Sequence, residues 1–312
     1  MPLSVSELTQ VKRAARQLPP DAPAVRVETF LSSTLGLNPA QSAQYFPDPD
    51  PTGSLEVAIG HLTQQREQML RDECLIPGYI IHEDVTGIRF VSGFDAYLAS
   101  KNAEPRLRGR LLRHHDVRSA VRRMQNGHDV EALAAAIMNV QCDYGEATRG
   151  SGDQGIDAIG WSELVLIDPF VSDGVHFGNR STPGEKVFLF ASSKAFTDGG
   201  NGAPKAINPA HIRELVGGWS IQRSSVGMWQ KVGIRMLSPV QMILVTTYRL
   251  SLDAKAECRG LGIQVWGIPE LVYLICKSAP VDVFDEANSY AFSSARFRAW
   301  WRQRDTTRVM AA

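Results

Sequence analysis

A lysine at the end of an apolar segment is the first residue of this sequence whose placement suggests chemistry. The run KVFLFASS at 186–193 is typical of a strand, and Lys194 follows it on the face shared with Ser192. A buried ammonium needs a charge partner, and Asp157, at the lip of the glycine-rich turn GSGDQGID, is the expected one. An amine beside a carboxylate can activate water. The same pair can also be a plain structural ion pair at a sheet edge.

The segments around this pair indicate alternating helices and strands. Asp129 is expected to cap a helix with a buried stripe formed by Val130, Leu133, Ala134, Ile137 and Met138. Asn208 and Pro209 predict a second helix start, followed on one face by Ile212, Leu215, Val216 and Trp219. The expected strands are 158–161, 164–167, 186–193, 241–247 and 263–266. Further helices are expected at 252–259, ended by Gly260, and at 269–276. This order predicts an α/β fold, a mixed sheet with helices on both faces.

The N-terminal part has a different pattern. Residues 1–104 combine helical stretches such as 54–70 with a β-like section at 79–90, so we expect an α+β domain with a boundary near 101–105. Residues 106–124 then read as one basic helix. No internal repeat of 20 to 50 residues is visible.

Composition excludes several classes of protein. The 312 residues have no net charge and are 44% hydrophobic and 21% charged, which is ordinary for a folded protein and argues against collagen-like or disordered chains. No run of 18 apolar residues is present, and the N-terminus lacks a signal-peptide pattern, so we expect a cytoplasmic protein. Four scattered cysteines fit unpaired thiols in a reducing compartment.

The basic residues are unevenly distributed. Residues 105–128 hold seven Arg against Asp116, whereas residues 1–104 hold 8 Lys or Arg against 13 Asp or Glu. The basic helix is either a solvated face or a contact to the DNA backbone. The candidate DNA-binding residues are Arg106, Arg108, Arg110, Arg113, Arg118, Arg122, Arg123 and Lys205.

Several motifs occur in one order along the second half of the chain. They are GSGDQGIDAIG at 150–160, a strand ending in SSK, HIRELVGGW at 211–219, the run MILVTTYRLSLDAKAECRGLGIQVWG at 242–267, and PELV at 269–272. Together they resemble the catalytic domain of Mrr-like restriction endonucleases, a branch of the PD-(D/E)xK nuclease superfamily. The resemblance covers roughly residues 129–277.

The resemblance implies an active site residue by residue. The helix acid of the family falls on Glu131, the strand aspartate on Asp157 and the lysine on Lys194. The position two before the lysine, usually glutamine or glutamate, is Ser192, which departs from the pattern. Restriction enzymes that recognise CCGG-containing sites show the same serine and recruit a glutamate from the next helix, which here is Glu214. Their Arg-rich reading motif is absent, so their site preference is not carried over.

The resemblance also implies Mg²⁺ as cofactor. Asp157 and Glu214 would be its ligands, with Glu131 as a further or water-mediated one. Lys194 would orient the attacking water, and Ser192 would be a poor ligand. The alternative for Glu214 is an idle helix-surface salt bridge with Arg213.

The expected function is a type II restriction endonuclease that cuts double-stranded DNA as a homodimer. Residues 1–104 would be a recognition or dimerisation domain, 105–285 the endonuclease domain and 286–312 a basic aromatic tail. Two alternatives remain: a modification-dependent, Mrr-like endonuclease, and a DNA-binding protein whose nuclease fold has lost catalysis. Asp153 is expected to be a turn residue rather than a metal ligand.

Overall fold

The chain divides into two compact units, residues 1–115 and 116–312. The computed structural model describes residues 3–47, 53–71, 77–124, 127–147, 156–163, 170–172, 175–177, 186–194, 206–224 and 239–302. The predicted division at residues 104 and 105, and the roles of the three predicted parts, stay predictions.

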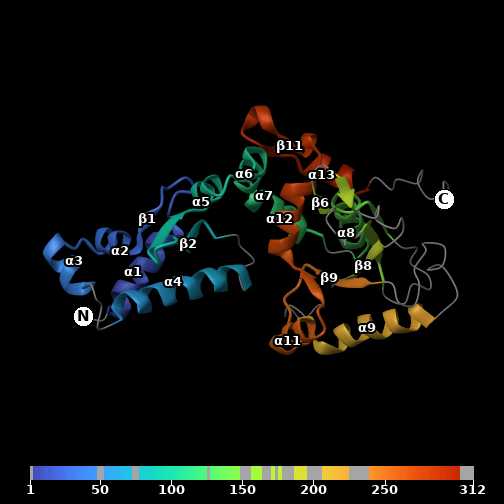
Figure 1. The fold of residues 1–312 in the computed structure, drawn as a ribbon, viewed down its shortest axis with the longest axis horizontal. Helices are drawn as coiled ribbons and strands as arrows, with labels where there is room; N and C mark the ends of the chain where they lie inside the picture. The colour runs from blue at the N-terminus through green and yellow to red at the C-terminus, as the bar shows by residue number, and fades with distance from the viewer. Residues whose placement is uncertain are drawn as a thin grey trace. The chain divides into compact units, whose positions relative to one another are not determined.

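The first unit is an α+β arrangement around a small antiparallel sheet (Figure 1). Its strands are β1 (Val25–Arg26), β2 (Tyr79–Glu83) and β3 (Arg89–Gly93), in the order β1-β3-β2. Its helices are α1 (Val5–Arg16), α2 (Val27–Leu35), α3 (Pro39–Tyr45), α4 (Ser54–Arg71), α5 (Phe94–Ser100) and α6 (Pro105–Leu111). The core includes Val11, Val27, Leu31, Leu62 and Tyr79. The predicted helix at 54–70 and the β-like section at 79–90 are confirmed.

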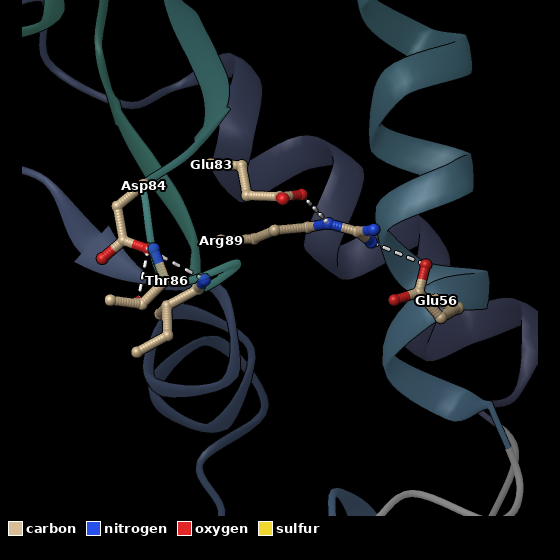
Figure 2. A network of polar contacts seen from close by, with 6 residues as sticks. Glu56, Glu83, Asp84, Thr86 and Arg89 are labelled. Carbon is tan, nitrogen blue, oxygen red and sulfur yellow. Dashed lines mark hydrogen bonds and ion pairs between the residues drawn. The ribbon is translucent and has the colours of Figure 1, made fainter.

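Polar contacts fix the β2–β3 hairpin. The Asp84 carboxylate accepts hydrogen bonds from the backbone of Thr86 and Ile88 and from the Thr86 hydroxyl, and the hydroxyl bond is the largest cause of its lowered pKa. Figure 2 shows the Arg89 guanidinium between two acids, with Nε 3.2 Å from Glu83 and Nη1 2.6 Å from Glu56 of α4. These contacts hold the hairpin against α4.

The basic segment is not one helix as predicted. Helix α6 ends at Leu111, and α7 (His114–Arg122) begins after a turn. The ring Nδ1 of His114 lies 2.9 Å from the Leu111 carbonyl, a bond that competes with the backbone partner of a continuous helix. Leu111 is buried while Leu112 is 44% exposed, so the turn also sets which leucine enters the core.

The second unit is built on a five-stranded mixed sheet with the order β10-β9-β8-β5-β4. The strands are β4 (Tyr144–Ala147), β5 (Ala158–Glu163), β8 (Lys186–Lys194), β9 (Val240–Thr246) and β10 (Gln264–Trp266). β8, β9 and β10 are parallel, whereas β4, β5 and β8 are antiparallel. A separate small hairpin pairs β6 (Phe170–Ser172) with β7 (Val175–Phe177). The predicted fold class is confirmed, and the strand predicted at 164–167 lies outside the described residues.

Helices cover both faces of this sheet. α8 (Gly127–Gln141) packs so closely that a Cβ added at Gly145 or Gly160 would lie 2.7 or 3.5 Å from the Met138 Cβ. α9 (Pro209–Ser224) and α11 (Leu252–Gly260) pack on the other face, where Ile212 and Leu215 meet Leu244. β8 and β9 lie between α8 and α9 in Figure 1. The five predicted apolar residues of α8 are all buried.

The end of the chain packs against α8. α12 (Ile268–Ser278) leads through η1 (Val281–Val283), β11 (Phe284–Asp285), η2 (Glu286–Asn288) and β12 (Ala291–Phe292) to α13 (Ser294–Arg302). α13 contacts α8 and buries Phe297 and Trp301. Asp129 was expected to cap α8, but the helix begins at Gly127, and the Asp129 carboxylate lies 3.7 Å from the Arg302 guanidinium. The described part of the segment predicted as a tail therefore contains η2, β12 and α13.

Two further sequence expectations concern the described residues alone. Cys142, Cys258 and Cys276 form no disulfide within the described part of the chain, while Cys74 lies outside it. Among the helices that the structure describes, none is both long and apolar enough to cross a bilayer.

Candidate active site

The predicted site residues of the sheet gather where β5 begins and β8 ends. The Asp157 N–H donates to the carbonyl of Ala191 at 2.8 Å, although Ala191 is already paired with Ala158, so the regular β5–β8 register ends at Ala158. Facing residues of paired strands share a side of the sheet, so Ser192, in register with Leu244, lies on the face that α9 covers. The half-buried Asp157 carboxylate accepts the Ser193 N–H at 2.5 Å.

Lys194 is paired with the predicted helix acid. Its Nζ lies 3.6 Å from Oε2 of Glu214, and the two side chains are 21% and 61% exposed. The sequence predicts Asp157 as the partner of Lys194, whereas the ion pair observed for Lys194 is with Glu214. The alternative pairing of Glu214 is not formed, because the Arg213 Nε instead donates to Glu257 of α11 at 3.0 Å. The register of β8 thus brings Lys194 to the helix that the sequence identified.

The helix that carries Glu214 starts as predicted. Asn208 precedes it, and the Asn208 side-chain oxygen accepts the Ala210 N–H at 3.0 Å. Pro209 is the first helical residue, where a missing N–H costs nothing. Ile212 and Leu215 are buried against the sheet, so the intervening Glu214 is turned toward solvent and the end of β8. The side chain of Trp219, the last residue of the predicted stripe, lies outside the described part of the structure.

Ser192 occupies the position where an acid was expected. Its side chain is fully buried, and among the described residues no partner lies within hydrogen-bond distance of its hydroxyl or of the Ser193 hydroxyl. A buried hydroxyl without a partner costs about 1–3 kcal/mol. Ser192 therefore contributes a small polar group at the site without a charge.

Glu131 lies on the opposite side of the sheet from Glu214. It belongs to α8, and its Oε2 lies 3.0 Å from Nδ1 of His128. Across the described residues, no three His, Cys, Asp or Glu side chains come close enough to hold a metal ion. The predicted ligand set of Asp157, Glu214 and Glu131 therefore stays a prediction. Two carboxylates that each contact the end of β8 still fit Mg²⁺, which takes one or two carboxylates together with waters and substrate phosphate.

The predicted DNA-binding arginines differ in exposure. The Arg108 guanidinium makes two 2.8 Å bonds to Asp95, and Arg110 is only 4% exposed. Arg106, Arg122 and Arg123 are exposed, while Arg113 and Arg118 are half-buried. Lys205 and Asp153 lie outside the described residues. The exposed members are the ones whose guanidinium groups can reach a phosphate.

Sequence reasoning missed one residue at this edge. Thr246 is the last residue of β9, lies in register with Lys194 and is fully buried. Its hydroxyl donates to the Lys194 carbonyl at 3.0 Å. A signal was present in QMILVTT, where the first hydroxyl residue ends a buried apolar run as Ser192 does in β8.

Comparisons with known proteins return only distant structural likenesses. No protein-family model and no curated protein sequence matches the chain. The MspJI restriction endonuclease in complex with a 27-mer oligonucleotide aligns with a TM-score of 0.35 and 14% identity, over 62% of this chain and 36% of that one. The DNA modification-dependent restriction endonuclease AspBHI aligns with a TM-score of 0.36 and 14% identity, over 72% of this chain and 59% of that one. Restriction endonuclease FokI aligns with a TM-score of 0.32 and 10% identity, over 94% of this chain and 46% of that one. The chain thus spans about a third to three fifths of these proteins, and such values identify no activity or residue role.

Proposed function

We propose that this protein is a Mg²⁺-dependent endonuclease that hydrolyses phosphodiester bonds in double-stranded DNA, of the type II restriction kind. The observation that carries the proposal is the meeting of Lys194 and Glu214 at 3.6 Å, at the end of β8 where the Asp157 carboxylate accepts the Ser193 N–H. An amine at the end of β8, a carboxylate just before β5 and a carboxylate on α9 supply the groups that this hydrolysis needs.

Each side chain has a separate task in the proposed reaction. Lys194, 21% exposed at the end of β8, orients the attacking water and assists loss of its proton. Glu214, 61% exposed on α9, is open to a ligand from solvent while it neutralises the lysine. Asp157 is held in place by the Ser193 N–H, which leaves its orientation fixed before DNA arrives.

The proposed metal fits the donor chemistry of this edge. Asp157 and Glu214 would hold Mg²⁺, which when bound neutralises charge on the phosphate and stabilises the leaving oxygen. Glu131 would act through a water from the α8 side. The buried Ser192 hydroxyl has no partner among the described residues but is a weak ligand beside two carboxylates.

The test is a cleavage assay on methylated and unmethylated phage DNA, in Mg²⁺ and in EDTA. We expect discrete fragments in Mg²⁺ with the unmodified chain, and none with Lys194→Met or Glu214→Gln. Glu257→Gln is the matched control, because it removes an ion-paired carboxylate of the neighbouring helix α11 and should cut normally. Equal cutting by Glu214→Gln and Glu257→Gln would contradict the proposed site.

The same digest separates the endonuclease types. Fragments from unmethylated DNA support the type II reading, whereas fragments from methylated DNA alone would replace it with a modification-dependent enzyme. Sedimentation of the chain with and without DNA tests the proposed homodimer, since cutting both strands requires two sites.

A non-catalytic DNA-binding protein is the second candidate. It is favoured by Ser192, which leaves the strand without its second acid, and by the 61% exposure of Glu214. Under this function, gel shifts in Ca²⁺ would show DNA binding while no divalent cation supports cleavage by the intact chain.

A further inference from the structure

We infer that Thr246 is a positioning residue for Lys194, because its hydroxyl ties the end of β8 to the turn that follows β9. The Thr246 Oγ1 donates to the Lys194 carbonyl at 3.0 Å and accepts the Tyr248 N–H at 3.0 Å. The side chain is fully buried. One hydroxyl group thus connects two backbone segments that follow different strands.

The position of Thr246 explains why a hydroxyl is needed there. β8 and β9 run parallel, and their paired register ends at Lys194 and Thr246. β9 ends at Thr246, and the chain bends at residues 247 and 248. The hydroxyl takes the Lys194 carbonyl at the point where regular strand pairing ends, and it satisfies a buried polar group that would otherwise be costly.

The turn after Thr246 continues toward α9. The Arg249 carbonyl accepts the Ile207 N–H at 2.8 Å, and the Ser251 N–H donates to the Ile207 carbonyl at 2.9 Å. Ile207 is fully buried and immediately precedes Asn208, which caps α9. Tyr248 and Leu250 also pack in the apolar cluster of α9 and α11. A short series of hydrogen bonds therefore runs from Lys194 through Thr246 to the start of the helix that carries Glu214.

This connection bears on the geometry of the ion pair. The Lys194 side chain leaves from the strand end, and Glu214 lies in the second turn of α9, so their 3.6 Å separation depends on how these two elements are held. Loss of the Thr246 hydroxyl removes one hydrogen bond from the Lys194 carbonyl and one from the Tyr248 N–H. The effect of Thr246 on the position of Lys194 does not depend on any reaction, whereas its effect on DNA cleavage rests on the proposed function.

The experiment compares Thr246→Val, which removes the hydroxyl, with Thr246→Ser, which keeps it, in the full chain. A water-soluble carbodiimide joins a carboxylate and an amine in contact as an amide, and the exposed Glu214 is open to the reagent. The yield of the Lys194–Glu214 amide is measured by mass spectrometry, with Glu214→Gln as the blank. Thr9→Val is the matched control, because the Thr9 hydroxyl also donates to a backbone carbonyl, at Val5, far along the sequence from the site.

We expect Thr246→Val to lower the amide yield and kcat for DNA cleavage on the order of tenfold, because small misplacements of catalytic groups have effects up to about a hundredfold. KM should change little, and Thr246→Ser should restore both readouts. Wild-type yield in Thr246→Val, or a Thr246→Ser chain as impaired as Thr246→Val, would overturn the inference.

Two further arms keep the result interpretable. If Thr246→Val does not fold, as judged by its melting curve, Thr246→Ala is compared with Thr246→Ser, since these two differ chiefly in the hydroxyl. If the unmodified chain cuts no DNA, the proposed function fails, and the amide yield alone decides the role of Thr246.

Discussion

Replacing Asp157 in two ways separates its structural role from its proposed catalytic one. The Asp157 carboxylate accepts the Ser193 N–H, and the Asp157 backbone N–H donates to the Ala191 carbonyl. Asp157 therefore contacts the end of β8 at two positions, two residues apart. Asp157→Asn keeps an oxygen that can accept this bond but removes the charge. Asp157→Ala removes both. The two variants should therefore differ in stability and agree in lost activity.

The size of the stability effect follows from the bond. A hydrogen bond to a charged acceptor contributes about 1.5–3 kcal/mol, and the half-burial of Asp157 favours the lower end, about 1.5–2 kcal/mol for Asp157→Ala. A neutral acceptor is roughly half as strong, so Asp157→Asn should cost about 0.5–1 kcal/mol. For a unit of this size each kcal/mol shifts Tm by about 2–4 °C, which predicts a fall of about 3–8 °C for Asp157→Ala.

The assay combines melting curves with cleavage in Mg²⁺ and gel shifts in Ca²⁺. Both variants should lose cleavage by on the order of a hundredfold or more, as when a group that stabilises transition-state charge is removed. DNA binding should persist, because the proposed contact is at the scissile phosphate rather than at base edges. Asp157→Asn cutting at the wild-type rate, or melting as low as Asp157→Ala, would refute the reasoning.

Three further predictions concern other parts of the chain. Gly145→Ala should destabilise the protein by about 2–3 kcal/mol in urea unfolding, because the new Cβ would lie 2.7 Å from the Met138 Cβ and even closer to the α8 backbone. Burial raises the pKa of Tyr79 to about 12 from 10.0, so the stability that the neutral Tyr79 phenol contributes is complete below pH 10 and is lost as the pH rises through 12. Tyr79→Phe should therefore reduce the loss of stability at alkaline pH, measured by unfolding at a series of pH values. Arg122 is exposed, so Arg122→Ala should weaken DNA binding and lower the slope of log affinity against log salt by about 1 in filter-binding titrations. Arg108→Ala is the control and should leave that slope unchanged, because Arg108 is half-buried and bound to Asp95 through two hydrogen bonds.

Local pattern predicted the elements that carry the site. The apolar stripe of α8, the strand that ends in Lys194 and the cap at Asn208 all lie where the sequence places them. Each of these signals is contained within a few neighbouring residues: a period of 3.6, a period of 2, or a capping side chain followed by proline.

Contacts between distant segments could not be predicted in the same way. Asp129 has the right type to cap α8, but Arg302, 173 positions later, is its partner in the folded unit. The break after Leu111 depends on the His114 ring reaching back to a carbonyl. The choice of Glu214 came from the resemblance to known nucleases, and no local pattern could have shown that Thr246 would meet the Lys194 carbonyl.

The mixed sheet has a consequence for the order in which a growing chain acquires this site. α8 and the strands β4, β5 and β8 come first in the sequence, and these three strands pair antiparallel. α9 and the strands β9 and β10 follow, and these two strands join the sheet in parallel. Asp157 and Lys194 belong to the early half, while Glu214 and Thr246 belong to the late half. Parallel pairing must wait for its crossover segment, so β9 cannot dock until Glu214 has already emerged from the ribosome. A nascent chain that ends before β9 holds the lysine without its carboxylate partner fixed in place, and the complete edge forms only near the end of synthesis.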